Sequence, residues 1–314
     1  RVVLDAAQLP ASFVQCQGEA RNAFGNGELY AEQLIGNARH IEVQIIGDQQ
    51  GNVSHLWERD CSLQRRQQKL IEIAPSPNLP ETARTAIIEA ALTLARAVDY
   101  QGVGTFEFLL DADNPQHFYF MEANPRIQVE HTVTEQITDI DLLQTQLQLA
   151  AGASLAQLGL STPPPINGCA VQLRINLERQ QADGSTQPAS GTITAYEPAS
   201  GPGLRVDGYG YSGYRANPSY DSLLAKLIVH AGDYATALHR AYRALCEFRL
   251  EGVSHNIALL QSLIRLPEVA ANQLDTRFVE RHMARLLDAS HAHRNMSFSL
   301  ADSSESHAQA PAEI

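Results

Sequence analysis

Lysine and methionine are scarce in this sequence. Of the 23 basic residues among 314, only Lys69 and Lys226 are lysines, and the first of three methionines is Met121. The four cysteines are scattered and form no CxxC pair, which excludes a zinc ribbon and gives no sign of a disulfide framework. We therefore expect reduced thiols in a cytoplasmic protein.

Long apolar runs and an excess of positive charge are absent as well. No run approaches the ~18 residues of a membrane-spanning helix, and no basic-then-apolar leader opens the chain. Asp and Glu number 35 against 23 Lys and Arg, a net charge of -12. Because most of such a surface repels phosphates, we expect neither nucleic acid nor a membrane as partner, although a small basic pocket is compatible with it.

The length predicts about two domains, and the proline-rich segment 161–165 is the expected boundary. Alternating and periodic apolar positions predict an α+β fold, whose second part is a separate unit. Strands are expected over 40–46, 52–56, 70–74, 105–110, 118–123, 170–176, 191–196, 204–206 and 223–230, and helices over 80–99, 134–152, 234–248 and 257–264. Within the first strand, His40, Glu42 and Gln44 share one face, opposite its apolar residues.

The hairpin predicted over 105–123 carries the strongest local chemistry. A turn at its centre places Glu107 opposite Glu122 and Thr105 opposite Asn124. Two facing carboxylates repel each other, and together with an amide oxygen they suit one or two Mg²⁺ ions held with substrate phosphates.

The alternative for this hairpin is an acidic face satisfied by water. That alternative predicts polar neighbours, whereas alternation places Phe118 and Phe120 on the same face as Glu122. The aromatic neighbours therefore favour a cation site.

The segment after the hairpin, if extended, points Arg126, Gln128 and Glu130 to one side. A guanidinium beside an amide and a carboxylate can bind a small planar oxyanion and keep a base next to it. A structural salt bridge is the alternative and would be favoured for an isolated pair. The predicted metal ligands end just upstream, at Asn124, which favours the oxyanion site.

Three further patterns remain open on residue grounds. The run Arg-Arg-Gln-Gln-Lys at 65–69 could be a solvated turn, a nucleic-acid contact or a phosphate grip, and Arg174 alone is more typical of a structural ion pair. Residues 208–213 match GxGxxG, but Pro218 follows and no helix is predicted, so a glycine-rich hairpin loop is favoured over a dinucleotide site.

Four stretches in order, 57–66, 104–108, 121–131 and 174–176, together resemble the biotin carboxylase family of ATP-grasp ligases. The resemblance runs from residue 1 to about 287. It implies the later part of an ATP-grasp domain at 1–162, mostly antiparallel sheet with helices, and a biotin carboxylase C-terminal α+β domain at 166–288. Residues 289–314 are expected to be a disordered tail or linker.

The resemblance implies carboxylation of carrier-bound biotin through carboxyphosphate, driven by ATP with Mg²⁺ or Mn²⁺ and using bicarbonate. The roles it implies are metal binding by Glu107, Glu122 and Asn124, bicarbonate binding by Arg126, Gln128 and Val129, deprotonation by Glu130, stabilisation of bicarbonate and the transferring phosphoryl group by Lys69 and of the biotin enolate by Arg174, and nucleotide contacts by Glu32, Gln33, Ile35, His40, Gln64 and Gln67. Two positions differ from the family pattern, because Gln33 replaces a usual lysine and Gln67 a frequent histidine.

In the family, Arg1 would directly follow the glycine-rich lid over the phosphates, and no Met-Lys-Met carrier motif is present here. We therefore expect this chain alone to be inactive. The expected partners are a biotinyl carrier domain, a carboxyltransferase domain or subunit and a second copy in a homodimer. The alternatives are another bicarbonate-using ATP-grasp ligase, such as one making carbamoyl phosphate, and a non-catalytic dimerisation or regulatory module.

Overall fold

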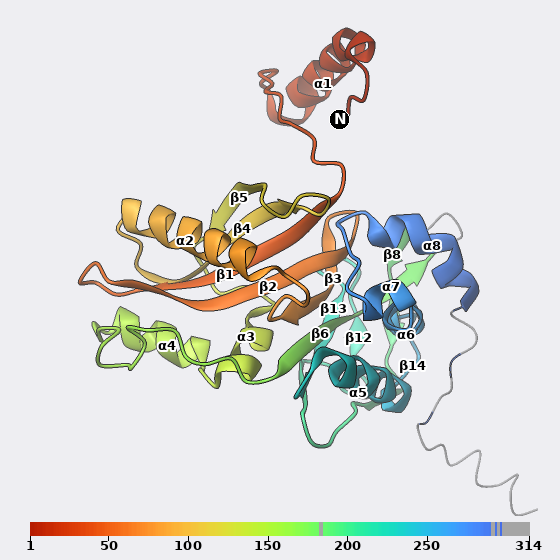
Figure 1. Cartoon of the computed structure of the whole chain (residues 1–314). Coiled ribbons are helices and arrows are strands. Elements are labelled where there is room, and N and C mark those ends of the chain that lie inside the picture. The colour runs from red at the N-terminus through yellow and green to blue at the C-terminus, as the bar shows by residue number, and fades with distance from the viewer. Residues whose placement is uncertain (182–184, 290–292, 294–295, 297–314) are drawn as a thin grey trace, which may run out of the picture. The chain divides into compact units, whose positions relative to one another are not determined.

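The computed structural model describes residues 1–181, 185–289, 293 and 296 (Figure 1). Two compact units are present, Arg1–Gly36 and Asn37–Ile314. The first contains the 3₁₀ helix η1 (Ala6–Gln8) and helix α1 (Leu9–Phe24), which ends at Gly25 in the left-handed conformation. The predicted tail lies almost entirely outside the described residues.

An eight-stranded sheet organises the second unit. Its order is β11-β13-β6-β3-β2-β1-β4-β5, and every pairing is antiparallel, which confirms the predicted α+β fold with a mostly antiparallel sheet. The strands are β1 (Ala38–Gly47), β2 (Val53–Arg65), β3 (Gln68–Ala74), β4 (Gly102–Asp111), β5 (Phe118–Asn124), β6 (Cys169–Asn176), β11 (Leu204–Gly208) and β13 (Leu223–Ala231).

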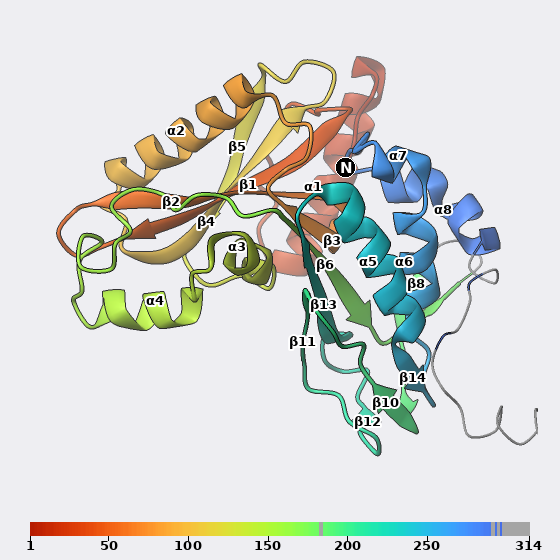
Figure 2. The same cartoon turned by 60° about the horizontal axis from the view of Figure 1, so that its bottom comes forward.

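Helices cover both faces of the β1, β2, β4 and β5 region. Helix α2 (Glu81–Ala97) packs on one face, and α3 (His131–Thr138) and α4 (Leu142–Ala150) lie on the other (Figures 1 and 2). The helices predicted over 134–152 are α3 and α4, which are separated because Asp139 takes a left-handed conformation, after which Asp141 caps α4.

The remaining elements surround β6 and β13. They are α5 (Tyr234–Glu247), α6 (Ile257–Ile264), α7 (Pro267–Ala270) and α8 (Phe278–Ala289), and three strand pairs, β7 (Glu178–Gln180) with β8 (Thr186–Pro188), β9 (Gly191–Thr192) with β12 (Arg215–Ala216), and β10 (Ala195–Glu197) with β14 (Arg249–Glu251). None of the helices in the described part of the chain has the length and apolarity to cross a bilayer.

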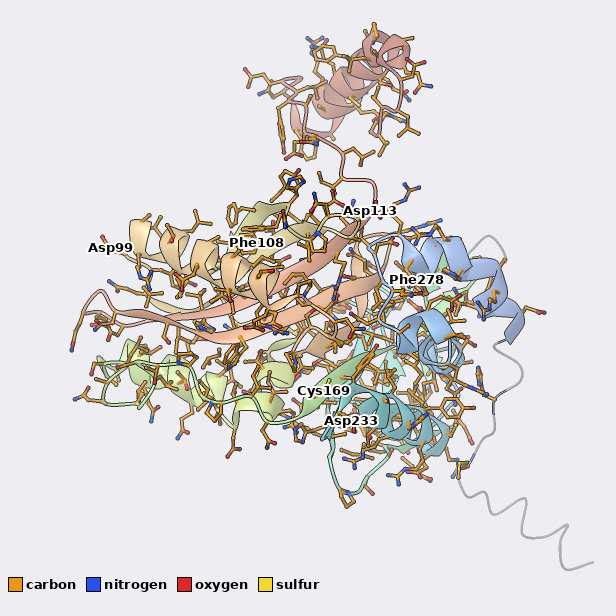
Figure 3. All side chains as sticks on the ribbon, in the orientation of Figure 1. Asp99, Phe108, Asp113, Cys169, Asp233 and Phe278 are labelled. Atoms are coloured by element: carbon orange, nitrogen blue, oxygen red, sulfur yellow. The ribbon has the colours of Figure 1, made fainter. Side chains whose placement is uncertain are left out.

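Two main apolar cores hold the sheet to its helices. Phe108 belongs to the core under α2, and Phe278 to the core around β6, β13 and α5–α8 (Figure 3). The first core also takes the apolar face of β1, so that the opposite face presents His40, Glu42 and Gln44, as the alternation predicted. This division leaves a polar face available for a site.

The sheet continues through the expected domain boundary. Residues 161–165 lie in the loop between α4 and β6, but β3 pairs with β6 in the register Ile71↔Leu173. The second part therefore shares one sheet with the first instead of building a sheet of its own. The domain limits 1–162 and 166–288 stay a prediction.

Candidate active site

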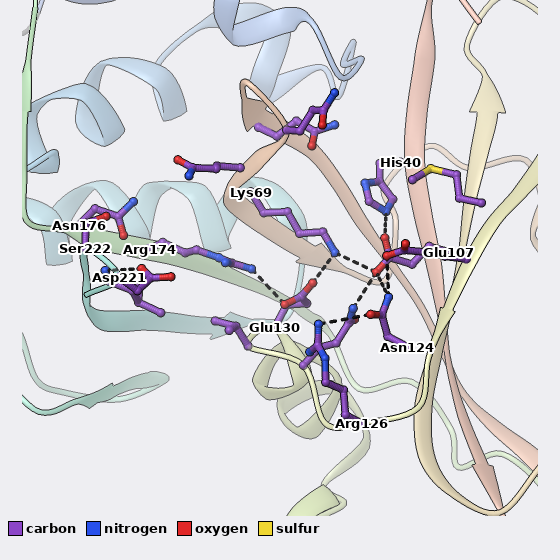
Figure 4. A pocket seen from close by; sticks show the side chains of 18 residues that line it. His40, Lys69, Glu107, Asn124, Arg126, Glu130, Arg174, Asn176, Asp221 and Ser222 are labelled. Carbon is purple, nitrogen blue, oxygen red and sulfur yellow. Dashed lines mark hydrogen bonds and ion pairs between the residues drawn. The ribbon is translucent and has the colours of Figure 1, made fainter. Parts of the chain in front are cut away.

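A cavity of about 620 Å³ opens where side chains of β1 to β6, the loop after β5 and the start of β13 meet (Figure 4). It contains every predicted site residue of the second unit. Those residues are His40, Gln64, Gln67, Lys69, Glu107, Glu122, Asn124, Arg126, Gln128, Val129, Glu130 and Arg174. Segments far apart in the sequence thus form one site.

Lys69 lies among three carboxylates. Its Nζ donates to Glu42 Oε2 at 2.6 Å and to Glu130 Oε1 at 2.5 Å, and it is 3.5 Å from Glu107 Oε1. Burial alone would lower the pKa of Lys69, but Cys61 and these carboxylates raise it above its usual value. The ammonium is therefore charged at neutral pH.

Glu130 bridges two cations contributed by neighbouring strands. One oxygen accepts from Lys69 of β3, and the other accepts from Arg174 Nη2 of β6 at 3.0 Å. Arg174 Nε also donates to Glu72 at 2.5 Å, and burial raises the pKa of that carboxyl above its usual value although Arg174 opposes the shift. The carboxylate of Glu130 is thus oriented from both sides.

Two β-bulges direct side chains into the cavity. In the β2–β3 pairing, Leu63 faces Ile71 and Gln64 faces Lys69, so Leu70 is the extra residue. Leu70 and Ile71 both enter the apolar core, which leaves Lys69 on the opposite face together with Glu72. The bulge therefore brings Lys69 to the face that also carries Arg174.

The second bulge corrects one prediction. Glu107 does face Glu122, and Thr105 faces Asn124, as expected, but Phe108 faces Phe120, so Met121 is the extra residue. Phe118 and Phe120 consequently contact the buried Phe108 on the opposite face, Phe118 partly buried and Phe120 46% exposed. The prediction that these aromatic rings share the face of Glu122 is wrong, because the bulge interrupts the alternation.

The Glu107, Glu122 and Asn124 side chains converge as predicted. Asn124 Nδ2 donates to Glu107 Oε1 and to Glu122 Oε1, both at 2.9 Å. Although burial opposes it, the hydrogen bond to His40 and the charge of Lys69 lower the pKa of Glu107 to about 2.

A polar hydrogen-bearing group thus occupies the point between two carboxylates where a cation would bind. Turning the Asn124 amide would present its oxygen, which now accepts from Arg126 Nη2 at 3.3 Å, as the third ligand. Oxygen donors of this kind suit Mg²⁺ or Mn²⁺, so the residues fit the metal that the resemblance implies.

The Arg126–Glu130 segment is not extended. It forms an irregular loop and turn that leads into α3, yet Arg126, Gln128 and Glu130 still reach the cavity. Gln128 Nε2 donates to Glu107 Oε1 at 2.7 Å, which links this loop to the predicted metal ligands. The expected conformation is wrong, whereas the expected convergence is confirmed.

The run at 65–69 serves several purposes. Arg65 makes a bidentate pair with Glu178, and Arg66 and Gln67 form the β2–β3 turn with positive φ, a conformation typical of two-residue hairpins. Only its last three residues line the cavity.

The GxGxxG segment forms a loop from β11 to β12, and no helix follows it. Because β11 and β12 lie in different sheets, the loop is not the hairpin we expected.

Sequence reasoning missed six lining residues, namely Gln68, Met121, Asn176, Asp221, Ser222 and Leu223. Asn176 could have been found, because it follows Arg174 by one strand period. Nothing in the sequence linked Asp221 to the site. Glu32, Gln33 and Ile35 belong to the first unit, and their nucleotide contacts stay a prediction.

Two family profiles match the chain. The family described as carbamoyl-phosphate synthase L chain, ATP binding domain, matches residues 1–158, and that described as biotin carboxylase C-terminal domain matches residues 172–281. Pyruvate carboxylase of Aspergillus niger is 46% identical over 282 residues, 89% of this chain and 23% of the relative. Mitochondrial pyruvate carboxylase of Homo sapiens is 45% identical over 284 residues, 90% of this chain and 24% of the relative.

Solved structures give the same relationship. The biotin carboxylase domain of a single-chain bacterial carboxylase has a TM-score of 0.81 at 45% identity, covering 93% of this chain and 64% of that one. The biotin carboxylase domain dimer of Hydrogenobacter thermophilus 2-oxoglutarate carboxylase, in complex with MgADP and bicarbonate, has a TM-score of 0.83 at 38% identity, covering 91% and 62%. The chain spans about a quarter of the length of the curated relatives it matches. On its profiles, its fold and its relatives, the chain belongs to the biotin carboxylase family of ATP-grasp proteins.

Proposed function

We propose that the protein is a ligase that carboxylates biotin on a carrier domain at the expense of ATP and bicarbonate. The observation that carries the proposal is Glu130, a carboxylate held between Lys69 and Arg174 in the same cavity as three converging oxygen donors. Cations around a carboxylate suit a small oxyanion that must be bound and deprotonated. The neighbouring oxygen donors suit the metal ions that accompany nucleotide phosphates.

Each residue then has a separate task. MgATP, when bound, supplies the phosphoryl group and the metal charge that stabilises its transfer. Arg126, with Gln128 and Val129, binds bicarbonate, and Glu130 accepts its proton. Lys69 stabilises the negative charge that develops on the transferring group, and Arg174 that on the biotin oxygen. Glu107, Glu122 and Asn124 would hold the metal.

The proposal extends to partners and location. It includes a biotinyl carrier domain, a carboxyltransferase and a homodimer, in a cytoplasmic compartment that keeps the four free cysteines reduced. The structural relatives include pyruvate, 2-oxoglutarate and long-chain acyl-CoA carboxylases, so the final acceptor differs among them and the proposed reaction is the carboxylation of biotin alone.

ATP hydrolysis by the full-length polypeptide that contains this chain tests the proposal. We expect hydrolysis to require bicarbonate and to rise with free biotin, and Glu130→Gln to lower kcat by about 100-fold or more. Glu89→Gln, an exposed change on α2, is the control. Stimulation by ammonia with indifference to biotin would instead indicate a ligase that makes carbamoyl phosphate. Absence of MgADP binding in calorimetry would indicate a non-catalytic module.

A further inference from the structure

A second cavity, of about 360 Å³, adjoins the candidate active site. Asp221, Ser222 and Leu223 line both cavities, and Figure 4 shows Asp221 and Ser222 beside Asn176 and Arg174 at one end of the first. The functions proposed above make no use of this second cavity.

The end of β6 leads from one cavity to the other. Arg174 and Asn176 line the first cavity, and Leu177, the next residue, lines the second. Asn176 faces Leu223 in the β6–β13 pairing, and Leu177 donates its N–H to the Ser222 carbonyl at 2.7 Å. At about 3.3 Å per residue, Leu177 lies about 10 Å along the chain from Arg174.

The two cavities differ in chemistry. The first is lined mainly by charged and amide side chains, whereas the second is lined mainly by tyrosine, leucine, proline and alanine side chains. Tyr209 and Tyr214 pack edge to face with ring centroids 5.4 Å apart, and Tyr220, which also lines this cavity, is 74% exposed. Among the described lining residues, Asp221 is the sole charged one. Bicarbonate and phosphate would lose hydration there without gaining a cation, so an apolar occupant is favoured.

Resting on the proposed function, we propose that this second cavity binds the methylene chain of carrier-linked biotinyl-lysine while the ureido ring lies beside Arg174. A biotin held at Arg174 must be joined to its carrier by a long apolar chain, and that chain has to leave the first cavity. Beyond Asp221, Ser222 and Leu223, which line both cavities, the second cavity offers an apolar, aromatic wall that removes methylenes from water. Free biotin carries the shorter chain and makes less use of this wall.

Biocytin, the biotinyl-lysine, and free biotin are the two probes that test the proposal. Each is supplied to the full-length polypeptide after its own carrier lysine has been replaced, and biotin-dependent ATP hydrolysis is measured. We expect kcat/KM for biocytin to exceed that for free biotin, and Tyr220→Ala to reduce this preference by about fivefold. Tyr119→Ala, an exposed tyrosine of β5 that lines neither cavity, should keep the preference.

Three outcomes would overturn the inference. Equal losses with both substrates would show that Tyr220 acts on the ring site or on the fold, and an unchanged ratio would show that the cavity does not contact the chain. Both leave the proposed function intact, because biotin still stimulates hydrolysis. Hydrolysis that neither substrate stimulates in the unaltered protein would reject the proposed function together with the inference.

Discussion

Arg59 is fully buried and connects β1, β4, α3 and the loop before α3 behind the candidate active site. Its guanidinium donates to Glu42 and, at 2.8 to 3.4 Å, to Gln44, Thr134, Thr105 and Gln128. Burial alone would raise the pKa of Glu42, but the charges of Arg59 and Lys69 outweigh it and lower that pKa to about 2. Glu42 in turn positions Lys69, so that Arg59 influences the site without lining it.

Removing Arg59 should be costly. Arg59→Met leaves the buried Glu42 carboxylate with Lys69 alone, and we expect unfolding free energy to fall by about 3–5 kcal/mol. Urea denaturation measures this loss. Adding Glu42→Gln removes the uncompensated charge and should restore more than about 1 kcal/mol, whereas strictly additive losses would contradict the coupling.

His55 predicts a pH dependence of stability away from the site. Burial lowers its pKa to about 4, against 6.5 for the exposed side chain. Between pH 6.5 and 4 the unfolded chain therefore binds a proton that the folded chain excludes. The unfolding free energy is unaffected by the titration of His55 above pH 6.5 and falls as the pH drops from 6.5 to 4, by roughly 3 kcal/mol in total. His55→Asn keeps an acceptor for the Trp57 N–H and should flatten the curve, measured as urea midpoint against pH, while the exposed His239→Asn should not.

Residue chemistry was largely predictable from the sequence. Carboxylates, amides and cations are recognised by type, and the strand period correctly placed Glu107 opposite Glu122. The roles of Arg59 and Glu72 were not predictable, because a buried ion pair is specified by partners from other strands and not by neighbours in sequence.

At the scale of elements, the approach of β4 to β5 depends on Gly104. A Cβ there would lie 1.8 Å from the Tyr100 hydroxyl and 2.9 Å from the Asn124 carbonyl. Gly104→Ala must displace the tyrosine or the strand that carries a predicted metal ligand.

We expect Gly104→Ala to lower unfolding free energy by about 1–3 kcal/mol and to weaken MgADP binding as well. Denaturation and calorimetry measure the two effects. Gly232→Ala, where no atom lies within 4 Å, should change neither. If Gly104→Ala is destabilised but binds MgADP with full affinity, Asn124 does not contribute to the nucleotide site.

Most predicted strands and helices overlap observed elements, but β2 continues to Arg65 beyond the predicted 52–56, and helices α1, α7 and α8 were not predicted. The irregularities of the elements were not predicted either. The prediction of helices over 134–152 did not place the break at Asp139, and the bulges at Leu70 and Met121 change which face the preceding residues occupy. A bulge depends on pairing with a second strand, so the periodicity of one segment carries no sign of it.

At the scale of the whole molecule, the sheet should make the second unit unfold as one. Leu173 of β6 is fully buried, and Leu173→Ala should cost about 2–5 kcal/mol. The sole tryptophan, Trp57 of β2, reports on the other part of the sheet and donates to the Pro164 carbonyl. In the Leu173→Ala variant, we expect the unfolding free energy measured by Trp57 fluorescence and that measured by hydrogen exchange in α5 to fall by the same amount. Separate unfolding transitions would indicate independent domains.

The shared sheet itself was beyond sequence reasoning. The prolines at 163–165 indicate a connection, but they carry no information on whether the segments on either side pair. The β3–β6 ladder is a long-range contact, and only its geometry brings Lys69 and Arg174 to one carboxylate.

The extra residue at Leu70 has a consequence for how related sequences are compared. Without the bulge, strict alternation from Glu72 would place Leu70 on the cavity face and Lys69 in the apolar core, although every charged residue of the site would still be in the chain. A sequence can therefore keep the lysine and lose the site. Whether two successive residues before Glu72 both enter the core, and not the presence of a lysine alone, is the feature to check before an activity is transferred from one member to another.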